Sequence, residues 1–141
     1  MTDAANKTLA DVAAKMRGID ICILSTVTGD GAIAGRPMSN NAQVEYDGDS
    51  FYFSHGDTRT VGDIERNPRV GLGFQGADYF YVAVEGRAEL IRDKAAFQEH
   101  WSPDLDRWFK QGIDTPGLTM IAVRAERVHY WDGGDEGEIG I

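Results

Sequence analysis

The chain has 141 residues, the usual size of a single domain with one hydrophobic core. Its 23 acidic and 14 basic residues give a net charge of −9, and such a field repels nucleic-acid backbones and anionic lipid headgroups. We therefore expect neither nucleic acid nor membrane as a partner, although a local cluster of cations can still bind a phosphate. No apolar stretch has the length of a signal peptide or a membrane span, which predicts a cytoplasmic protein.

The first half of the chain alternates apolar residues with turn signals. Thr8 and Asp11 are spaced as a helix start, and Gly18 ends that helix. Thr28–Gly31 and Asp47–Asp49 contain the Asp-Gly pairs of tight reversals, so each predicts a hairpin between the strands that flank it. The expected elements are a helix over residues 8–18 and strands over residues 19–27, 32–38, 43–46 and 51–54.

The second half continues the pattern, with a helical excursion before the last strands. Asn67-Pro68 ends a helix, Gly86 permits a bend in a long strand, and Asp93 caps the excursion. The expected elements are helices over residues 60–66, 93–101 and 102–112, and strands over 69–74, 79–91, 118–123 and 128–131. The fold class is a mainly β domain: a six- to seven-stranded antiparallel split β-barrel with accessory helices. Residues 1–141 form one domain, with 1–7 and 133–141 as flexible tails.

One motif points to a different fold. Gly71–Gly76 satisfies the pattern G-x-G-x-x-G of dinucleotide-binding folds, in which a helix follows the glycines. Here the following residues, Asp78–Val82, have the composition of a strand. We therefore interpret the glycines as places where a barrel strand bends or where backbones approach closely.

Three segments in a fixed order carry a family resemblance: Gly35–Ser39, Phe51–His55 and Ile64–Pro68. The match continues through Gly86-Arg87-Ala88, Trp108-Phe109 and Tyr130-Trp131-Asp132. Together they resemble the pyridoxamine-phosphate-oxidase-like flavoproteins, and most of all their general-stress-protein branch. The resemblance implies a homodimeric split barrel that binds flavin mononucleotide (FMN) at equivalent sites across the subunit interface.

The resemblance also implies roles for particular residues. The implied FMN-binding residues are Arg36, Pro37, Met38, Ser54, His55, Thr58, Arg59, Thr60, Gln75, Trp108 and Trp131. Arg36, with its planar fork of donors, and the helix start at Thr58–Thr60 suit the phosphate. Pro37 and Met38 would face the flavin ring, and Ser54 and His55 would donate to the flavin or its phosphate. Thr60 departs from the family, which usually has a lysine at this position.

Several of these residues have plainer interpretations. Arg36 could be a solvated strand end, and His55 could be a surface residue that contributes only its backbone. Trp108 and Trp131 could pack in the core or in a dimer interface, because tryptophan buries much apolar area wherever it lies. Gln75, Trp108 and Trp131 are the weaker candidates.

The remaining titratable residues form no pattern typical of a catalytic or metal site. Cys22 is expected to be a small buried residue, and His100 and His129 have no second ligand at metal spacing. Arg127-Val128-His129 echoes a substrate-binding Arg-x-His element of true pyridoxamine phosphate oxidases, but its neighbours belong to the stress-protein branch. No catalytic acid, base or nucleophile can be assigned. No metal is expected.

The expected function is FMN binding, with a flavin-dependent oxidoreductase acting on an unidentified small molecule as one form of it. The first alternative is a non-catalytic flavin carrier or stress-response module. A second alternative is a split barrel that binds haem, a deazaflavin or nothing. The sequence names neither a substrate nor an electron donor.

Overall fold

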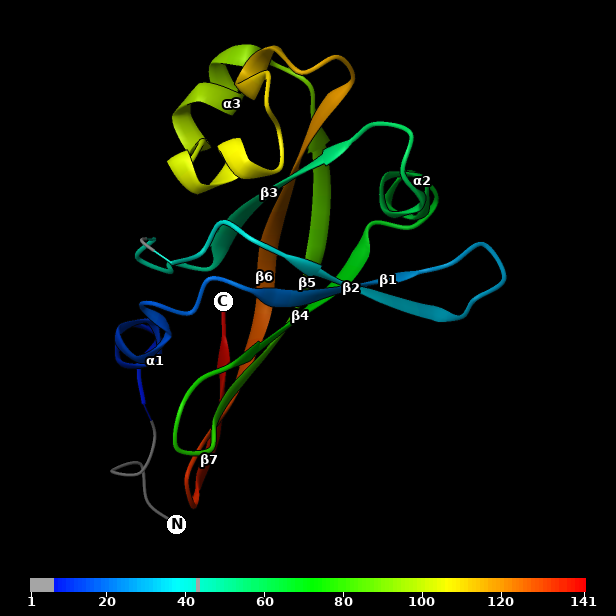
Figure 1. The fold of residues 1–141 in the computed structure, drawn as a ribbon. Helices are drawn as coiled ribbons and strands as arrows, with labels where there is room; N and C mark the ends of the chain where they lie inside the picture. Colours follow the sequence, from blue (N-terminus) through cyan, green and yellow to red (C-terminus); the bar gives the residue numbers. More distant parts are fainter. Residues whose placement is uncertain (1–6, 43) are drawn as a thin grey trace.

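The computed structural model describes residues 7–42 and 44–141, and its strands form one antiparallel sheet that curls into a split β-barrel (Figure 1). The sheet order is β2-β1-β4-β5-β6-β3, with β7 added beside β6. The strands are β1 Cys22–Val27, β2 Ile33–Met38, β3 Asp49–His55, β4 Arg69–Gln75, β5 Phe80–Ile91, β6 Leu118–Asp132 and β7 Asp135–Gly140. The predicted fold class is confirmed.

Side-chain caps set where the helices begin. The Thr8 hydroxyl accepts from the backbone N–H of Asp11 and the Asp11 carboxylate from that of Thr8, a capping box that starts α1 (Leu9–Met16). Thr58 caps α2 (Arg59–Arg66), and Asp93 caps α3 (Lys94–His100). The expected helix over 102–112 is shorter: a 3₁₀ turn, η2, covers Pro103–Arg107, and a second, η3, covers Gly112–Asp114.

The core has two parts. The larger lies inside the barrel and contains the fully buried side chains of Leu24, Tyr52, Val128 and Tyr130. The smaller joins one end of β3 and β6 to the helical excursion, through Phe53, Phe97, Leu105, Phe109, Leu118 and Met120. The excursion is therefore packed against one end of the barrel (Figure 1).

The hairpin expected around Asp47–Asp49 is wrong. The structure has no strand over residues 44–46, and Gln43 lies outside the described residues. Strand β3 pairs instead with β6, from Asp49 opposite Arg124 to His55 opposite Leu118. Tyr46, at 6% exposure, packs in the core. Residues 44–46 therefore do not pair with β3, which finds its partner far along the chain.

The two strands expected over 118–123 and 128–131 are one strand, β6, and the loose tail expected over 133–141 is wrong as well. The polar residues between them form a bulge rather than a turn, because the pairing of β5 with β6 shifts between Glu85 and Gly86. A Cβ on Gly86 would collide with the Arg124 carbonyl oxygen, so the bend expected at this glycine is a close backbone approach. Beyond the bulge, β7 pairs with β6 along its whole length.

The Gly71–Gly76 motif is not a nucleotide fingerprint. Gly71 and Gly73 lie within β4, and β5 follows after a turn, as the composition predicts. Residues 1–6 of the tail expected over 1–7 lie outside the described residues, and Lys7 donates its backbone N–H to the Tyr130 hydroxyl at 2.8 Å. Among the helices of the described residues, none is long and apolar enough to cross a membrane.

Candidate functional site

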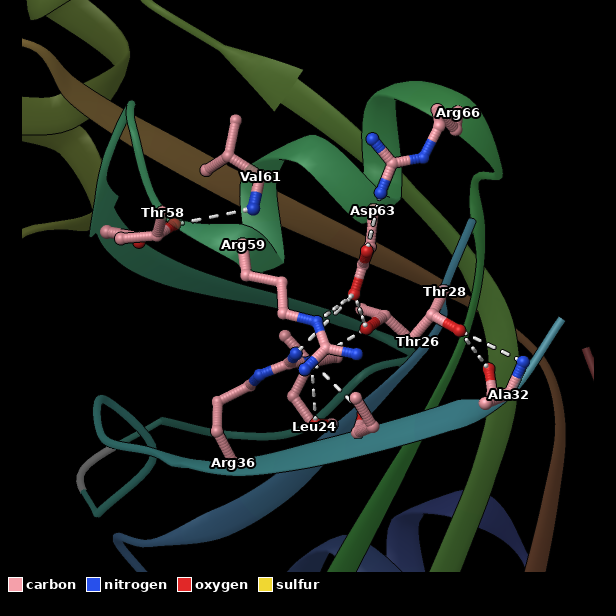
Figure 2. A network of polar contacts seen from close by, with 12 residues as sticks. Leu24, Thr26, Thr28, Ala32, Arg36, Thr58, Arg59, Val61, Asp63 and Arg66 are labelled. Atoms are coloured by element: carbon pink, nitrogen blue, oxygen red, sulfur yellow. Dashed lines mark hydrogen bonds and ion pairs between the residues drawn. The ribbon is translucent and has the colours of Figure 1, made fainter. Parts of the chain in front are cut away.

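Three arginines meet a single buried carboxylate where α2 packs against β1 (Figure 2). Asp63 is fully buried, and its Oδ2 accepts a 2.8 Å hydrogen bond from the Thr26 hydroxyl. Arg66 Nη2 lies 2.9 Å from Asp63 Oδ1, Arg36 Nη2 lies 3.7 Å from Oδ2, and Arg59 Nε lies 4.0 Å from the same oxygen. We call these four charged residues the arginine cluster.

Strand pairing positions Arg36 inside this cluster. Arg36 lies opposite Leu24, and its Nη1 donates to the carbonyl oxygens of Leu24 and Ala34 and, at 2.9 Å, to the Thr26 hydroxyl. Thr26 thus links the guanidinium to the Asp63 carboxylate. The side chain is only 20% exposed, so the plain interpretation of Arg36 as a solvated strand end is wrong.

The cluster holds more positive charge than its carboxylate can balance. Three guanidinium groups against one carboxylate leave a surplus of two positive charges. Burial lowers the pKa of Arg36; the Asp63 carboxylate raises it, and the neighbouring Arg59 lowers it. Figure 2 shows the guanidinium groups of Arg36 and Arg59 side by side. Two cations held together in this way can supply the donors of an anion site.

The start of α2 adds further donors to the cluster. Thr58 caps the Val61 N–H, while the N–H groups of Arg59 and Thr60 have no partner within the helix. The Ser54 and Thr58 hydroxyls are 2.9 Å apart and hold the turn that precedes the helix. Thr60 is 7% exposed, so the lysine common in the family would have to extend out from a buried position.

The remaining implied residues lie elsewhere. Pro37 points to the outer face of the sheet, opposite Ile23, whereas Met38 packs against the core. Gln75 and Trp131 flank Tyr81 in one row across β4, β5 and β6. A single chain therefore does not bring these two residues to the arginine cluster.

His55 and Trp108 form a third group, at the helical excursion. Both line a shallow hollow of about 270 Å³, where the His55 ring lies 5.2 Å from that of Phe109. Trp108 is 61% exposed, so the alternative that it packs in the core of the chain is wrong.

The sequence did not predict three members of this site: Thr26, Asp63 and Arg66. A signal was present, because Asp63 follows Arg59 by four residues and precedes Arg66 by three, which places all three on one helix face. A carboxylate in such a pattern is normally solvated, and its burial becomes visible only when β1 is placed beneath α2.

The contacts of Cys22, His100 and His129 indicate structural roles for these residues. Cys22 is buried, which confirms the expected small buried residue, and burial raises the pKa of its thiol to about 11. His100 stacks on Phe51, and His129 stacks on Trp131 and contacts Glu136. Within residues 7–42 and 44–141, no three His, Cys, Asp or Glu side chains are placed to hold a metal ion.

The fold and the sequence together define the class of protein. Residues 7–140 match the family described as pyridoxamine 5'-phosphate oxidase like, and the chain belongs to that family. Among curated proteins, General stress protein 26 of Bacillus subtilis (strain 168) is 28% identical over 112 residues, which are 76% of this chain and 79% of that protein. The stress-protein branch expected from the sequence is confirmed.

Solved structures share the fold. A Clostridium acetobutylicum protein related to general stress protein 26 superposes with a TM-score of 0.81 at 20% identity, covering 94% of each chain. The general stress FMN/FAD binding protein of Xanthomonas citri gives 0.75 at 18% identity, with 94% of each chain covered. A haem binding protein from Mycobacterium smegmatis gives 0.74 at 17% identity, covering 96% of this chain and 59% of that one.

Proposed function

We propose that this chain binds FMN and that the arginine cluster with the start of α2 holds the phosphate. The observation that carries the proposal is the pair of adjacent guanidinium groups, Arg36 and Arg59, with one carboxylate between three arginines. A phosphate dianion would balance the surplus charge of two. The similarity to the general stress FMN/FAD binding protein of Xanthomonas citri supports a flavin as the phosphate-bearing ligand.

The donor set fits a phosphate without rearranging the fold. Arg36 Nη1 is anchored to the strands, but its Nη2 lies 3.7 Å from Asp63, beyond hydrogen-bond distance. Arg59 is 69% exposed and touches Asp63 only at 4.0 Å. These two groups therefore have N–H donors to spare, as have the backbone N–H groups that open α2.

We also propose that the working unit is a homodimer formed through the outer face of β1, β2, β4 and β5. Exposed apolar side chains gather on this face: Ile23 is 47%, Ile33 70% and Tyr81 38% exposed. Gly73 lies opposite Ile23 at its centre, and a Cβ there would meet nothing within 4 Å, so a partner backbone has room to approach. A second copy would cover these side chains and bring its own Gln75 and Trp131 toward the flavin ring.

A bound flavin would supply hydride or electron transfer, and the chain's own residues would orient it and control its exposure. No residue of the described site is an evident acid, base or nucleophile for a substrate. A flavin carrier is therefore the second candidate function. Photoreduction of the loaded protein separates the two candidates, because an oxidoreductase reoxidises fastest with a particular acceptor, whereas a carrier shows no preference.

The absorption spectrum of the purified protein tests the cofactor. FMN gives bands in the blue and the near ultraviolet, while a strong Soret band would instead identify haem, the ligand of the Mycobacterium smegmatis relative. Light scattering of the same sample tests the dimer and should report twice the chain mass of 15.5 kDa. A monomer that retains FMN would contradict the dimeric site.

A further inference from the structure

A second hollow lies away from the arginine cluster. This cavity of about 390 Å³ is lined by the end of α1, residues 40–42 and 44–47 after β2, the start of β3, Phe74 of β4 and residues 99–104 at the end of α3. The volume falls in the range of small-molecule sites, roughly 300–1,000 Å³. None of the residues implied for flavin binding lines it. The proposed flavin binding therefore does not explain this cavity.

Carboxylates dominate the wall of the cavity. Its described lining residues include no lysine or arginine but six acids: Asp20, Glu45, Asp47, Asp49, Glu99 and Asp104. Glu45, Asp47, Glu99 and Asp104 are exposed and form the rim. Arg17 pairs with Glu45, Arg124 pairs with Asp49, and the positive charge of Arg107 acts on Asp20. Among the described residues, this leaves Asp47, Glu99 and Asp104 without an arginine or lysine partner. Such a rim concentrates cations and repels anions.

The floor carries buried polar atoms that lack partners. Among the described residues, the Asn40 Oδ1, Tyr46 hydroxyl and Ser50 hydroxyl oxygens make no hydrogen bond, and all three residues line the cavity. The residues are 9%, 6% and 3% exposed. Burying a polar atom without a partner is costly, so three in one wall indicate a site whose ligand completes them.

The orientation of Asn40 is fixed by its surroundings. Its Nδ2 donates to the carbonyl oxygens of Phe51, at 2.9 Å, and His100, at 3.0 Å, so a flipped amide would set oxygen against oxygen. The backbone has a φ of 142°, in a region that non-glycine residues rarely adopt. The Asp20 carboxylate holds this loop by accepting from the Asn40 N–H and the Ser39 hydroxyl. The free Oδ1 is therefore a positioned acceptor.

The remaining wall is apolar and aromatic. It includes Tyr46, Phe51, Phe74 and Trp101. The Phe51 ring is already engaged, because it stacks on His100 with centroids 3.6 Å apart and the Arg124 guanidinium lies over it, 5.4 Å from its centre. A metal ion does not suit this arrangement, because in the described residues no three acidic, histidine or cysteine side chains converge on a point. Dispersed carboxylates, acceptors and aromatic rings suit a larger cation with an apolar body.

We propose that this cavity binds an organic cation: a protonated amine whose N–H groups donate to the floor acceptors and whose aromatic-sized body packs on Tyr46 and Trp101. The acidic rim attracts the cation, and Asn40 Oδ1 fixes the ammonium. The site is independent of the flavin, so a failure of the proposed FMN binding would not contradict it.

Three indoles of similar size and different charge test the proposal on the full chain, with and without bound FMN. Isothermal titration calorimetry should show tryptamine, the cation, binding about tenfold or more tightly than neutral tryptophol, because a hydrogen bond to a charged group is worth about 1.5–3 kcal/mol. Anionic indole-3-acetate should bind most weakly. Equal affinities, no binding of tryptamine at millimolar concentration, or displacement of FMN by tryptamine would each overturn the proposal.

Two variants place the binding in the cavity without endangering the fold. Tyr46→Phe and Ser50→Ala each remove a hydroxyl that has no partner, so the free energy of unfolding should stay level or rise. Each should weaken tryptamine binding about two- to tenfold, the worth of one hydrogen bond. Asp135→Asn, which removes one negative charge outside the cavity, is the control and should change the affinity less than twofold. Unchanged tryptamine affinity in both hydroxyl variants would contradict the assignment.

Discussion

The arginine cluster beneath α2 and the cavity beside α3 are two polar sites of opposite charge in one small domain. In the cluster, three guanidinium groups surround the buried Asp63, and in the cavity six carboxylates line the wall. The net charge of −9 agrees in sign with the acidic wall of the cavity but not with the positive charge of the cluster. The charge of a ligand that a site accepts therefore depends on which side chains the strands bring together rather than on the net charge of the chain.

The two sites also differ in how their buried polar groups are satisfied. Asp63 accepts from Thr26 and Arg66, so the cluster has its own internal counterion and excess cations around it. Asn40, Tyr46 and Ser50 instead keep oxygen atoms without partners. We therefore expect changes in the cluster to affect both folding and binding, whereas removing the cavity hydroxyls should weaken binding without lowering the free energy of unfolding.

The largest effect is expected from Arg36→Ala, which removes the most buried guanidinium of the cluster. FMN affinity should fall about ten- to a hundredfold, because a charge-assisted hydrogen bond to phosphate contributes roughly 1.5–3 kcal/mol. Riboflavin, which lacks the phosphate, should bind as before, and fluorescence quenching measures both ligands. Arg92→Ala is the control, since Arg92 is an exposed arginine outside the cluster, paired with Glu65, and its loss should change FMN affinity less than threefold. Equal losses for FMN and riboflavin would remove Arg36 from the phosphate site.

Asp63→Asn should change stability and FMN binding in opposite directions. Loss of the buried carboxylate deprives Arg36 and Arg66 of their counterion, and the free energy of unfolding should fall by about 1.5–3 kcal/mol. FMN should bind more tightly at low salt, because the phosphate no longer competes with the carboxylate. Urea unfolding and flavin titration measure the two effects. Glu65→Gln on the same helix, whose exposed carboxylate pairs with Arg92, should shift neither quantity by more than about 1 kcal/mol.

Cys22 gives a pH test on the cavity side of the molecule, because its neighbour Asn41 lines the cavity. Burial raises the thiol pKa from 9.0 to about 11. A raised pKa means that the native state holds the proton longer than the unfolded state does. The thiol's contribution is therefore complete below pH 9 and is lost between pH 9 and 11, by up to about 1.4 kcal/mol per pH unit. Urea unfolding at pH 8 and pH 10.5 should show a smaller alkaline loss in Cys22→Ala than in the natural chain. An equal loss would mean that Cys22 does not contribute.

The smallest effect is expected from Thr60→Lys, which restores the lysine common in the family. Thr60 is buried, so the new ammonium must emerge beside Arg59 and stay in solvent, where one charge is worth up to about 1 kcal/mol. FMN should bind at most about fivefold more tightly at low salt, and the gain should shrink at high salt because exposed charges are screened. Titration at two salt concentrations checks this. A gain that salt leaves unchanged would show that the lysine acts through packing.

Local signals predicted most of the fold, and the errors arose where long-range pairing decided the outcome. The Thr8 capping box and the Thr28–Gly31 turn involve neighbouring residues, so both could be predicted from the sequence. Asp47–Asp49 has an equally good turn signal, yet β3 pairs with β6 instead. The polar stretch around Glu126 resembled a turn and is a bulge, because its neighbours pair with β5 on both sides of the register shift.

The sites were predictable to different degrees for the same reason. The resemblance led to Arg36, Thr58 and Arg59, which the structure gathers around α2, but not to Asp63, whose burial depends on β1. The cavity could not be predicted at all. Its wall combines four segments between Met16 and Asp104, and no one of them carries a motif.

One pair of titrations tests whether the arginine cluster recognises a phosphate. The natural chain is titrated with FMN and with riboflavin in the same buffer at about 0.1 M salt, and quenching of flavin fluorescence gives both dissociation constants. We predict that FMN binds about tenfold or more tightly than riboflavin, since only FMN can engage Arg36 and Arg59. Equal affinities for the two flavins would contradict the account.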